Sequence, residues 1–159
     1  MAEEKLWKEG FERVTAGTHQ VLKLDHFDIE LRTTFGSQHV PLTCRKATPA
    51  EINAGLEGHV LEFSGNSMSE GVQAQMRVEF KREERLLRIK FTLFASFNAV
   101  VQIFNQDDRF VGEVNVSDGE FDYAIPNGAE NSIGRLSMFY KLDYVGPTID
   151  RFEGYSWKP

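Results

Sequence analysis

The sequence predicts an all-β fold, an antiparallel β-sandwich or barrel, with one short helix at the N-terminus. Three observations lead to this prediction. From residue 19 onward, apolar and polar residues alternate with the period of two that is typical of half-buried strands. Turn-forming residues separate these segments about every 8–12 residues. The chain also contains 13 phenylalanines, which favours aromatic cross-strand pairs in a sheet-rich core.

The N-terminal segment is predicted to be an amphipathic helix. Within residues 3–14, the side chains of Leu6, Trp7, Phe11 and Val14 fall near one face at helical spacing, and Glu and Lys residues lie opposite. This helix or arm packs on the rest of the protein or, alternatively, docks onto a partner. The chain is accordingly divided into an N-terminal helix or arm at residues 1–18 and a β-sandwich domain at residues 19–159.

The strands follow in order along the chain. They are predicted at His19–Leu24, Phe27–Thr34, Val40–Arg45, His59–Ser64, Val72–Phe80, Leu86–Phe94, Ala99–Asn105, Phe110–Val116, Glu120–Ile125, Ile133–Tyr144 and Tyr155–Trp157. Turns are predicted at residues 106–108, 117–119 and 126–131, which are rich in Asp, Asn and Gly. A single helical turn is predicted where Thr48 caps, Pro49 takes the first helical position and Glu51 completes a capping box.

Length and charge restrict the classes of partner. A chain of 159 residues is long enough for one domain with its own core, and no linker, repeat or low-complexity segment interrupts it. The net charge of −6 argues against nucleic-acid binding, which requires a basic surface. No apolar run approaches the ~20 residues that a membrane span requires. We therefore expect neither a nucleic-acid partner nor membrane insertion.

No local motif points to catalysis. The four histidines form no H-x-H pair, so no metal site is predicted. Asp107 and Asp108 are adjacent and fit a hairpin turn better than an acid/base pair, and Cys44 fits a buried thiol better than a nucleophile. Nucleotide-binding and hydrolase motifs are absent from the sequence. We predict no enzymatic activity, no catalytic residues, no metal and no cofactor.

From Phe80 to Phe152, the order of motifs resembles the C-terminal half of a galectin. The stretch "FKREER" at 80–85 has the spacing of the galectin W-x-x-E-x-R signature, with Phe80 in place of the stacking Trp and with Glu83 and Arg85 as the Glu–Arg pair. The stretches "FVGEVN" from Phe110, "FDYAIP" and "SIGRLSMFYKLDYVGPTIDRF" resemble later galectin strands. The resemblance implies a galectin-like jelly roll that binds carbohydrate.

The upstream half of the galectin sugar motif departs from the family pattern. In "VLEFSGNSM", Glu62, Ser64 and Asn66 stand where galectins have His, Asn and Arg, and the next family Asn falls at Gln75 or Arg77. A Glu accepts hydrogen bonds but does not donate them when ionised, so the resemblance implies altered or lost galactoside specificity. The sugar-face residues that it implies are Glu62, Ser64, Asn66, Gln75, Arg77, Phe80, Glu83 and Arg85.

Phe80 decides the geometry of this predicted site. Strict alternation places Phe80 on the core side with Met76 and Val78, and it reaches the polar face only if the chain bulges at Glu79–Phe80. The polar face itself has two interpretations. Its side chains form a set of hydrogen-bonding groups for sugar hydroxyls, or they are simply the solvated face of an antiparallel sheet.

These observations predict a soluble, lectin-like carbohydrate-binding module whose partner is a glycan or glycoprotein. The alternative is a galectin-like scaffold without sugar binding that acts through protein–protein contacts or homo-oligomerisation at sheet edges. The N-terminus lacks the apolar region of a classical signal peptide. The expected location is therefore the cytoplasm, or the outside of the cell after secretion by a non-classical route.

Overall fold

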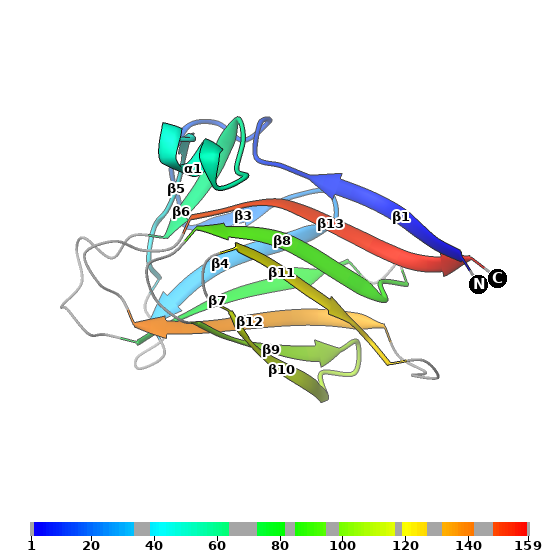
Figure 1. Ribbon diagram of the computed structural model, residues 1–159. Coiled ribbons are helices and arrows are strands. Elements are labelled where there is room, and N and C mark those ends of the chain that lie inside the picture. The colour runs from blue at the N-terminus through cyan, green and yellow to red at the C-terminus, as the bar shows by residue number, and fades with distance from the viewer. Residues whose placement is uncertain are drawn as a thin grey trace.

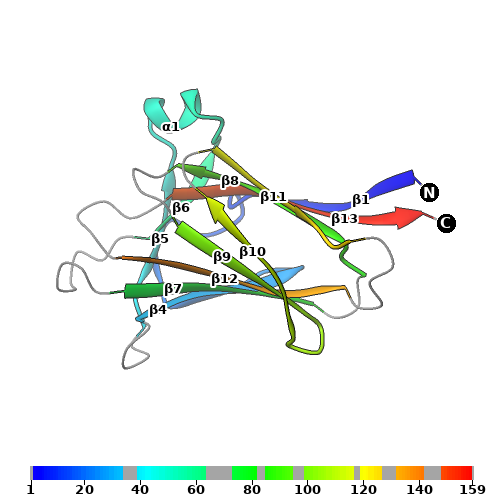
Figure 2. The same ribbon diagram turned by 60° about the horizontal axis from the view of Figure 1, so that its bottom comes forward.

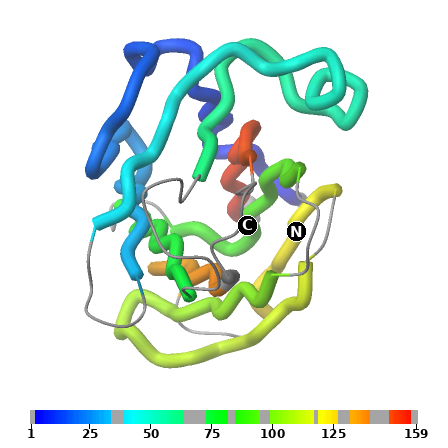
Figure 3. Tube along the Cα trace, turned by 90° about the vertical axis from the view of Figure 1, so that its left-hand side faces the viewer, coloured from blue at the N-terminus to red at the C-terminus, as the bar shows by residue number. Residues whose placement is uncertain are grey.

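The structure is a computed structural model, and it describes residues 2–33, 39–63, 73–81, 85–94, 99–116, 119–126, 132–141 and 148–158. It consists of two antiparallel sheets packed face to face (Figure 1), as the sequence predicts. Figure 3 looks along the strands and shows the orange β12 and the lime β9–β10 hairpin on one side and the red β13 on the other.

Each sheet combines strands that are far apart in the sequence. In spatial order, the seven-stranded sheet contains β11 (Gly119–Ala124), β8 (Arg88–Phe94), β13 (Thr148–Lys158), β6 (His59–Phe63), β5 (Leu42–Lys46) and β2 (Gly17–His19), with β1 (Ala2–Glu9) also paired to β13. The six-stranded sheet contains β10 (Phe110–Val116), β9 (Ala99–Asn105), β12 (Ile133–Lys141), β7 (Gln73–Phe80), β4 (Phe27–Thr33) and β3 (Val21–Lys23).

Alternation along the strands produces the core. In β7, the residues from Ala74 to Phe80 alternate between buried and solvent-facing, and the neighbouring β4 shows the same pattern from Phe27 to Thr33. Phenylalanines fill much of the space between the sheets. Phe152 packs against Phe27 and against Phe91, with ring centroids 4.8 Å apart in each pair. The contact between Phe27 and Phe152 crosses from one sheet to the other, whereas Phe91 and Phe152 lie on neighbouring strands of one sheet, which is the predicted kind of aromatic pair.

The predicted N-terminal helix is wrong. Residues Ala2–Glu9 form β1, which runs antiparallel to β13, so they belong to the seven-stranded sheet and do not form a separate helical arm at 1–18. The register shifts between Lys5 and Trp7, and this bulge leaves Trp7 buried with its ring stacked on His26. A bulge disturbs strict alternation, and the resulting apolar spacing imitated that of a helix.

Most other predicted elements are confirmed within about two residues at the ends that the structure describes. The capped turn is present as α1 (Pro49–Asn53), with the reciprocal hydrogen bonds between Thr48 and Glu51. The predicted strand His19–Leu24 is wrong as a single strand. It is divided into β2 and β3, which lie in different sheets, because the chain crosses between the layers at Gln20. The predicted strand at Tyr155–Trp157 is the end of the much longer β13.

Candidate carbohydrate-binding site

The candidate site lies on the outer face of the six-stranded sheet, where β9, β10 and β12 meet. Strand β9 lies between the other two, and Phe104 pairs with Phe110 on β10 and with Arg135 on β12. Figure 2 shows the β9–β10 turn at the same end of the sheet as the start of β12. These three cross-strand neighbours, Phe110, Phe104 and Arg135, are called the Phe104 row.

Two β-bulges border the Phe104 row. The register shifts between Phe110 and Gly112 on β10, and between Ile133 and Arg135 on β12. Each bulge places two residues of the neighbouring strand, β10 or β12, opposite one residue of β9 and thereby changes which face the following side chains occupy. The hydroxyl of Tyr123, from the other sheet, donates a 3.3 Å hydrogen bond to the carbonyl of Val111 in the first bulge. The bulges bring Phe110 and Arg135 beside Phe104.

The Phe104 row is continuous in space. The rings of Phe104 and Phe110 meet edge to face with centroids 6.0 Å apart. The guanidinium carbon of Arg135 lies 4.0 Å from the Phe104 centroid, a cation–π distance. Phe110 is 57% exposed, and it is one of few large apolar side chains exposed among the described residues. An exposed aromatic supported from below by another ring is a suitable stacking surface for a sugar.

A cleft of about 280 Å³ adjoins the row. It is lined by Arg77, Glu79, Phe80, Asn105, Gln106, Asp108, Gly134 and Arg135. These residues come from the end of β7, the β9–β10 turn and the start of β12. The volume is close to the lower end of the ~300–1,000 Å³ typical of small-ligand sites. The cleft therefore has room for a short stretch of a polymeric ligand.

The β9–β10 turn is fixed by Asn105. Its side-chain Oδ1 accepts hydrogen bonds of 2.9 Å from Asp107 N–H and 3.0 Å from Arg109 N–H. Asp108 has a φ of 62°, a left-handed conformation that Asp adopts more readily than most residues. Gly134 allows β12 to pass close beneath this turn, because a Cβ there would lie 2.6 Å from the backbone oxygen of Asn105. One side of the cleft is thus built from constrained backbone.

Charged groups of both signs occupy the cleft. Nη2 of Arg135 lies 3.2 Å from Asp108 Oδ1, and Nη2 of Arg77 lies 2.5 Å from Glu79 Oε1. Burial lowers the pKa of Arg135, and the neighbouring positive charge of Arg77 lowers it further. The Nε atoms of both arginines are buried without a hydrogen-bond partner among the described residues. Such an array offers donors and acceptors to polar ligand groups.

Three of the predicted sugar-face residues lie at or near this site. Arg77 and Phe80 line the cleft, and Gln75 shares the outer face of β7 with Arg77, where its amide donates a 3.0 Å hydrogen bond to Ser137. Phe80 nevertheless lies on the core side: it is 8% exposed and packs near Phe27 and Trp7. The β4–β7 register continues unbroken through the Phe80 pair, so the chain does not bulge there. Phe80 contributes an edge to the cleft and no open stacking face.

Glu62 lies elsewhere. It belongs to β6 of the seven-stranded sheet, and its carboxylate accepts a 2.5 Å hydrogen bond from Nε of Arg45. Arg45 also binds Glu51 in a bidentate pair at 2.7 and 2.8 Å. The structure therefore does not bring Glu62 together with Gln75 and Arg77, because the two sets occupy opposite sheets.

Arg85 is exposed just before β8, near the start of β12, since the carbonyl of the adjacent Leu86 accepts a hydrogen bond from Ile133 N–H. The remaining predicted residues, Ser64, Asn66 and Glu83, lie outside the described residues. The binding roles of all eight residues stay predictions.

The Phe104 row was not predicted as a site from the sequence. Its signal was weak but present: in the alternating strand Ala99–Asn105, Phe104 has the same parity as Gln102 and therefore faces solvent. An aromatic on a polar face is a recognisable candidate for binding. The contributions of Phe110 and Arg135 depend on the two bulges and on pairing between distant strands, which no local pattern reveals.

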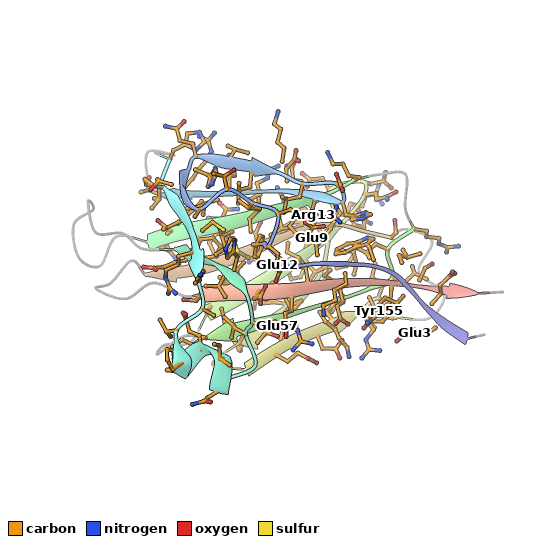
Figure 4. The ribbon with its side chains drawn as sticks, turned by 90° about the horizontal axis from the view of Figure 1, so that it is seen from above. Glu3, Glu9, Glu12, Arg13, Glu57 and Tyr155 are labelled. Atoms are coloured by element: carbon orange, nitrogen blue, oxygen red, sulfur yellow. The ribbon has the colours of Figure 1, made fainter. Side chains whose placement is uncertain are left out.

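A second group of charges lies on the seven-stranded side. Asp150 is fully buried, one carboxylate oxygen accepts a 3.0 Å hydrogen bond from Glu57 N–H, and burial raises its pKa to about 6. The carboxylates of Glu12 and Glu57, labelled in Figure 4, raise the pKa of Asp150 further.

Among the described residues, no three His, Cys, Asp or Glu side chains are arranged to hold a metal ion. The described helix is too short to cross a membrane.

The sequence matches no model of a protein family and no curated protein. The fold is similar to that of TmCBM61, whose structure was solved in complex with β-1,4-galactotriose: the TM-score is 0.55, with 12% identity over 82% of this chain and 88% of that chain. The enzymatically active domain of tailspike protein 4 of bacteriophage CBA120 has a lower TM-score of 0.49, with 13% identity over 84% of this chain and 20% of that chain. The mannan-recognising module TmCBM27 has a TM-score of 0.41, with 14% identity over 99% of this chain and 100% of that chain. The likeness to TmCBM61 confirms the antiparallel β-sandwich.

Proposed function

We propose that this chain is a carbohydrate-binding module that binds a glycan across the Phe104 row and into the adjoining cleft, without catalysing a reaction. The observation that carries the proposal is the arrangement of the row itself. An exposed Phe110 continues through Phe104 to Arg135, which lines a cleft rich in planar polar groups. Sugar rings present apolar C–H faces and hydroxyl edges, and this surface offers an aromatic face and hydrogen-bonding groups side by side.

The fold supports the proposal independently. TmCBM61, which shares it, was solved with a bound galactotriose. The galactoside specificity implied by the galectin resemblance is proposed to be altered or lost, because Glu62 is bound by Arg45 on the opposite sheet. A galectin-like site built around Phe80 and Arg85 and a site built around the Phe104 row predict different mutational effects.

Screening a panel of neutral and acidic glycans, followed by isothermal titration calorimetry on the best ligand, tests the proposal. We expect Phe104→Ala to lower affinity at least tenfold, or about 1.4 kcal/mol, because it removes the ring that contacts both Phe110 and Arg135. We expect Arg85→Ala to leave the affinity within about twofold. The opposite ranking would favour the galectin-like site. Binding to no member of the panel would contradict the proposal and favour a scaffold that acts through protein contacts.

A further inference from the structure

Two arginines of the cleft each have an N–H group that lacks an acceptor among the described residues. Arg77 and Arg135 project from neighbouring strands, β7 and β12, and both line the cleft. Each uses an Nη2 group for a carboxylate of this chain, and each leaves a buried Nε–H without a partner among the described residues. A buried donor without an acceptor costs about 1–3 kcal/mol, so each guanidinium gains free energy if its side chain turns to bring the Nε–H to an acceptor in the cleft.

We infer that the cleft selects glycans that carry an anionic substituent, a carboxylate or a sulfate ester, which binds between Arg77 and Arg135. This inference rests on the proposed function, because it assigns a ligand class to the same site. A planar or tetrahedral anion accepts several hydrogen bonds from guanidinium groups at once, and these charge-assisted bonds are stronger than neutral ones. The ligand's negative charge also relieves the repulsion between the two arginines.

Glu79 and Asp108 act as exchangeable counter-ions of this cleft. Their side chains are 52% and 68% exposed, whereas the Arg135 side chain is only 16% exposed. Ion pairs between exposed side chains contribute only about 0–1 kcal/mol, and in both of these pairs the carboxylate is the more exposed member, so water rehydrates it when a ligand displaces it from its arginine. A bound anion takes their place at the guanidinium groups.

The net negative charge of the protein makes a preference for acidic glycans informative about the cleft. With a net charge of −6, the protein repels anionic polymers in general, so affinity for an acidic glycan must come from a local cationic feature. Arg77 and Arg135, which lie on the paired strands β7 and β12, supply that feature.

Carboxylate removal distinguishes an anion site from a neutral-sugar site. In a neutral-sugar site, Glu79 and Asp108 accept hydrogen bonds from hydroxyls, and the double variant Glu79→Gln/Asp108→Asn lowers affinity. In an anion site the same carboxylates compete with the ligand, and the double variant raises affinity for acidic glycans. Glu120→Gln on β11, in the other sheet, is the matched control for the loss of a negative charge.

The experiment measures binding of three ligand sets by isothermal titration calorimetry at constant ionic strength: neutral galactan fragments, the same fragments after chemical sulfation, and oligogalacturonates. The result expected is at least about tenfold tighter binding of one of the acidic sets than of the neutral set. Arg77→Gln and Arg77→Lys should each remove that preference, the second because it keeps the charge but loses the planar donor array. Lys23→Gln, at the far edge of the same sheet on β3, should retain it.

Each outcome decides the inference. Equal affinity for neutral and acidic sets, or weaker acidic binding in the Glu79→Gln/Asp108→Asn variant, overturns it and leaves the proposed function standing. Binding of none of these sets by a protein that binds another glycan of the panel overturns the inference alone, and binding of no glycan at all overturns both. Competition by inorganic sulfate as strong as that by the sulfated glycan would show a free-anion site, which also overturns it. Thermal melting of each variant verifies folding, and the Arg77→Lys variant remains informative if Arg77→Gln unfolds.

Discussion

The guanidinium carbon of Arg135 lies 4.0 Å from the centroid of the Phe104 ring, and both residues owe their positions to strands that are not adjacent in the sequence. The contact joins the exposed aromatic edge of the six-stranded sheet to the charged cleft at its end. It therefore defines the surface on which the proposed function depends.

Phe110 is the first residue to test. We expect Phe110→Ala to weaken glycan binding roughly tenfold and to change the free energy of unfolding by less than about 1 kcal/mol, because the ring is 57% exposed. Ile52→Ala is a matched control, since Ile52 is 55% exposed on α1 of the opposite layer. Calorimetry and urea unfolding measure the two effects. Equal loss of binding in both variants would contradict a role for Phe110.

Phe80 should behave in the opposite way. Its ring is packed against Phe27 and Trp7, so Phe80→Ala should destabilise the protein by about 3–5 kcal/mol through the cavity that it leaves. Phe80→Leu should recover much of this loss and retain glycan binding, because the ring offers only an edge to the cleft. Loss of binding in a fully stable Phe80→Leu protein would show that the aromatic ring itself stacks on the ligand.

Gly134 should not tolerate a side chain. Gly134→Ala places a Cβ 2.6 Å from Asn105 backbone oxygen and 2.8 Å from Gln106 Cα, neither of which yields easily. We expect a loss of roughly 1–3 kcal/mol in stability together with weaker glycan binding, because the turn beside the cleft shifts. Gly17→Ala is the control: its Cβ meets nothing within 4 Å, and only its backbone φ of 126° is strained. A Gly134→Ala protein with unchanged binding would exclude the turn from the site.

Glu51 should stabilise the fold at neutral pH and lose this effect in acid. Although burial raises its pKa, hydrogen bonds from Arg45 and from Thr48 N–H lower it to about 2, below the ordinary 4.5. The stabilisation is complete above pH 4.5 and disappears as the pH falls toward 2. Glu51→Gln should cost roughly 3 kcal/mol at pH 7, as expected for a broken buried ion pair, and much less near pH 2. Urea unfolding across this range measures the difference, and a pH-independent difference would contradict the ionic role.

Asp150 should show the reverse dependence. Its pKa is raised from 3.8 to about 6, so the folded state binds the proton more tightly than the unfolded state between these values. The contribution of Asp150 to stability therefore falls as the pH rises from 4 to 6. Asp150→Asn retains an oxygen that accepts from Glu57 N–H and should be more stable than the parent at pH 8, by on the order of 2 kcal/mol. A variant that is less stable at pH 8 would show that the carboxylate charge has an unseen partner.

The sandwich and most strands were predictable from the sequence because alternation is a direct consequence of one face of a strand being buried. The predictions were wrong at the N-terminus, where the bulge between Lys5 and Trp7 interrupts alternation, and at His19–Leu24, where the chain crosses between the sheets. Both failures arise from tertiary pairing. Local hydrogen bonds, in contrast, made the α1 capping box predictable from Thr48 and Glu51 alone.

The candidate site was predictable only in part. Parity along β7 correctly placed Gln75 and Arg77 on a solvent-facing surface and Phe80 on the core side. The separation of Glu62 from this surface depends on which strands share a sheet, and the Phe104 row depends on two bulges. Neither property is encoded within a short stretch of residues.

Chemical-shift mapping by NMR shows which residues of the protein the glycan contacts, and so tests binding at the Phe104 row. Titrating the best ligand of the glycan panel into ¹⁵N-labelled protein should shift the backbone amides of Phe104, Phe110 and Arg135, and leave those of Arg45 and Glu62 on the opposite sheet unchanged. Saturable binding whose largest shifts lie on the seven-stranded sheet would contradict a binding site at the Phe104 row.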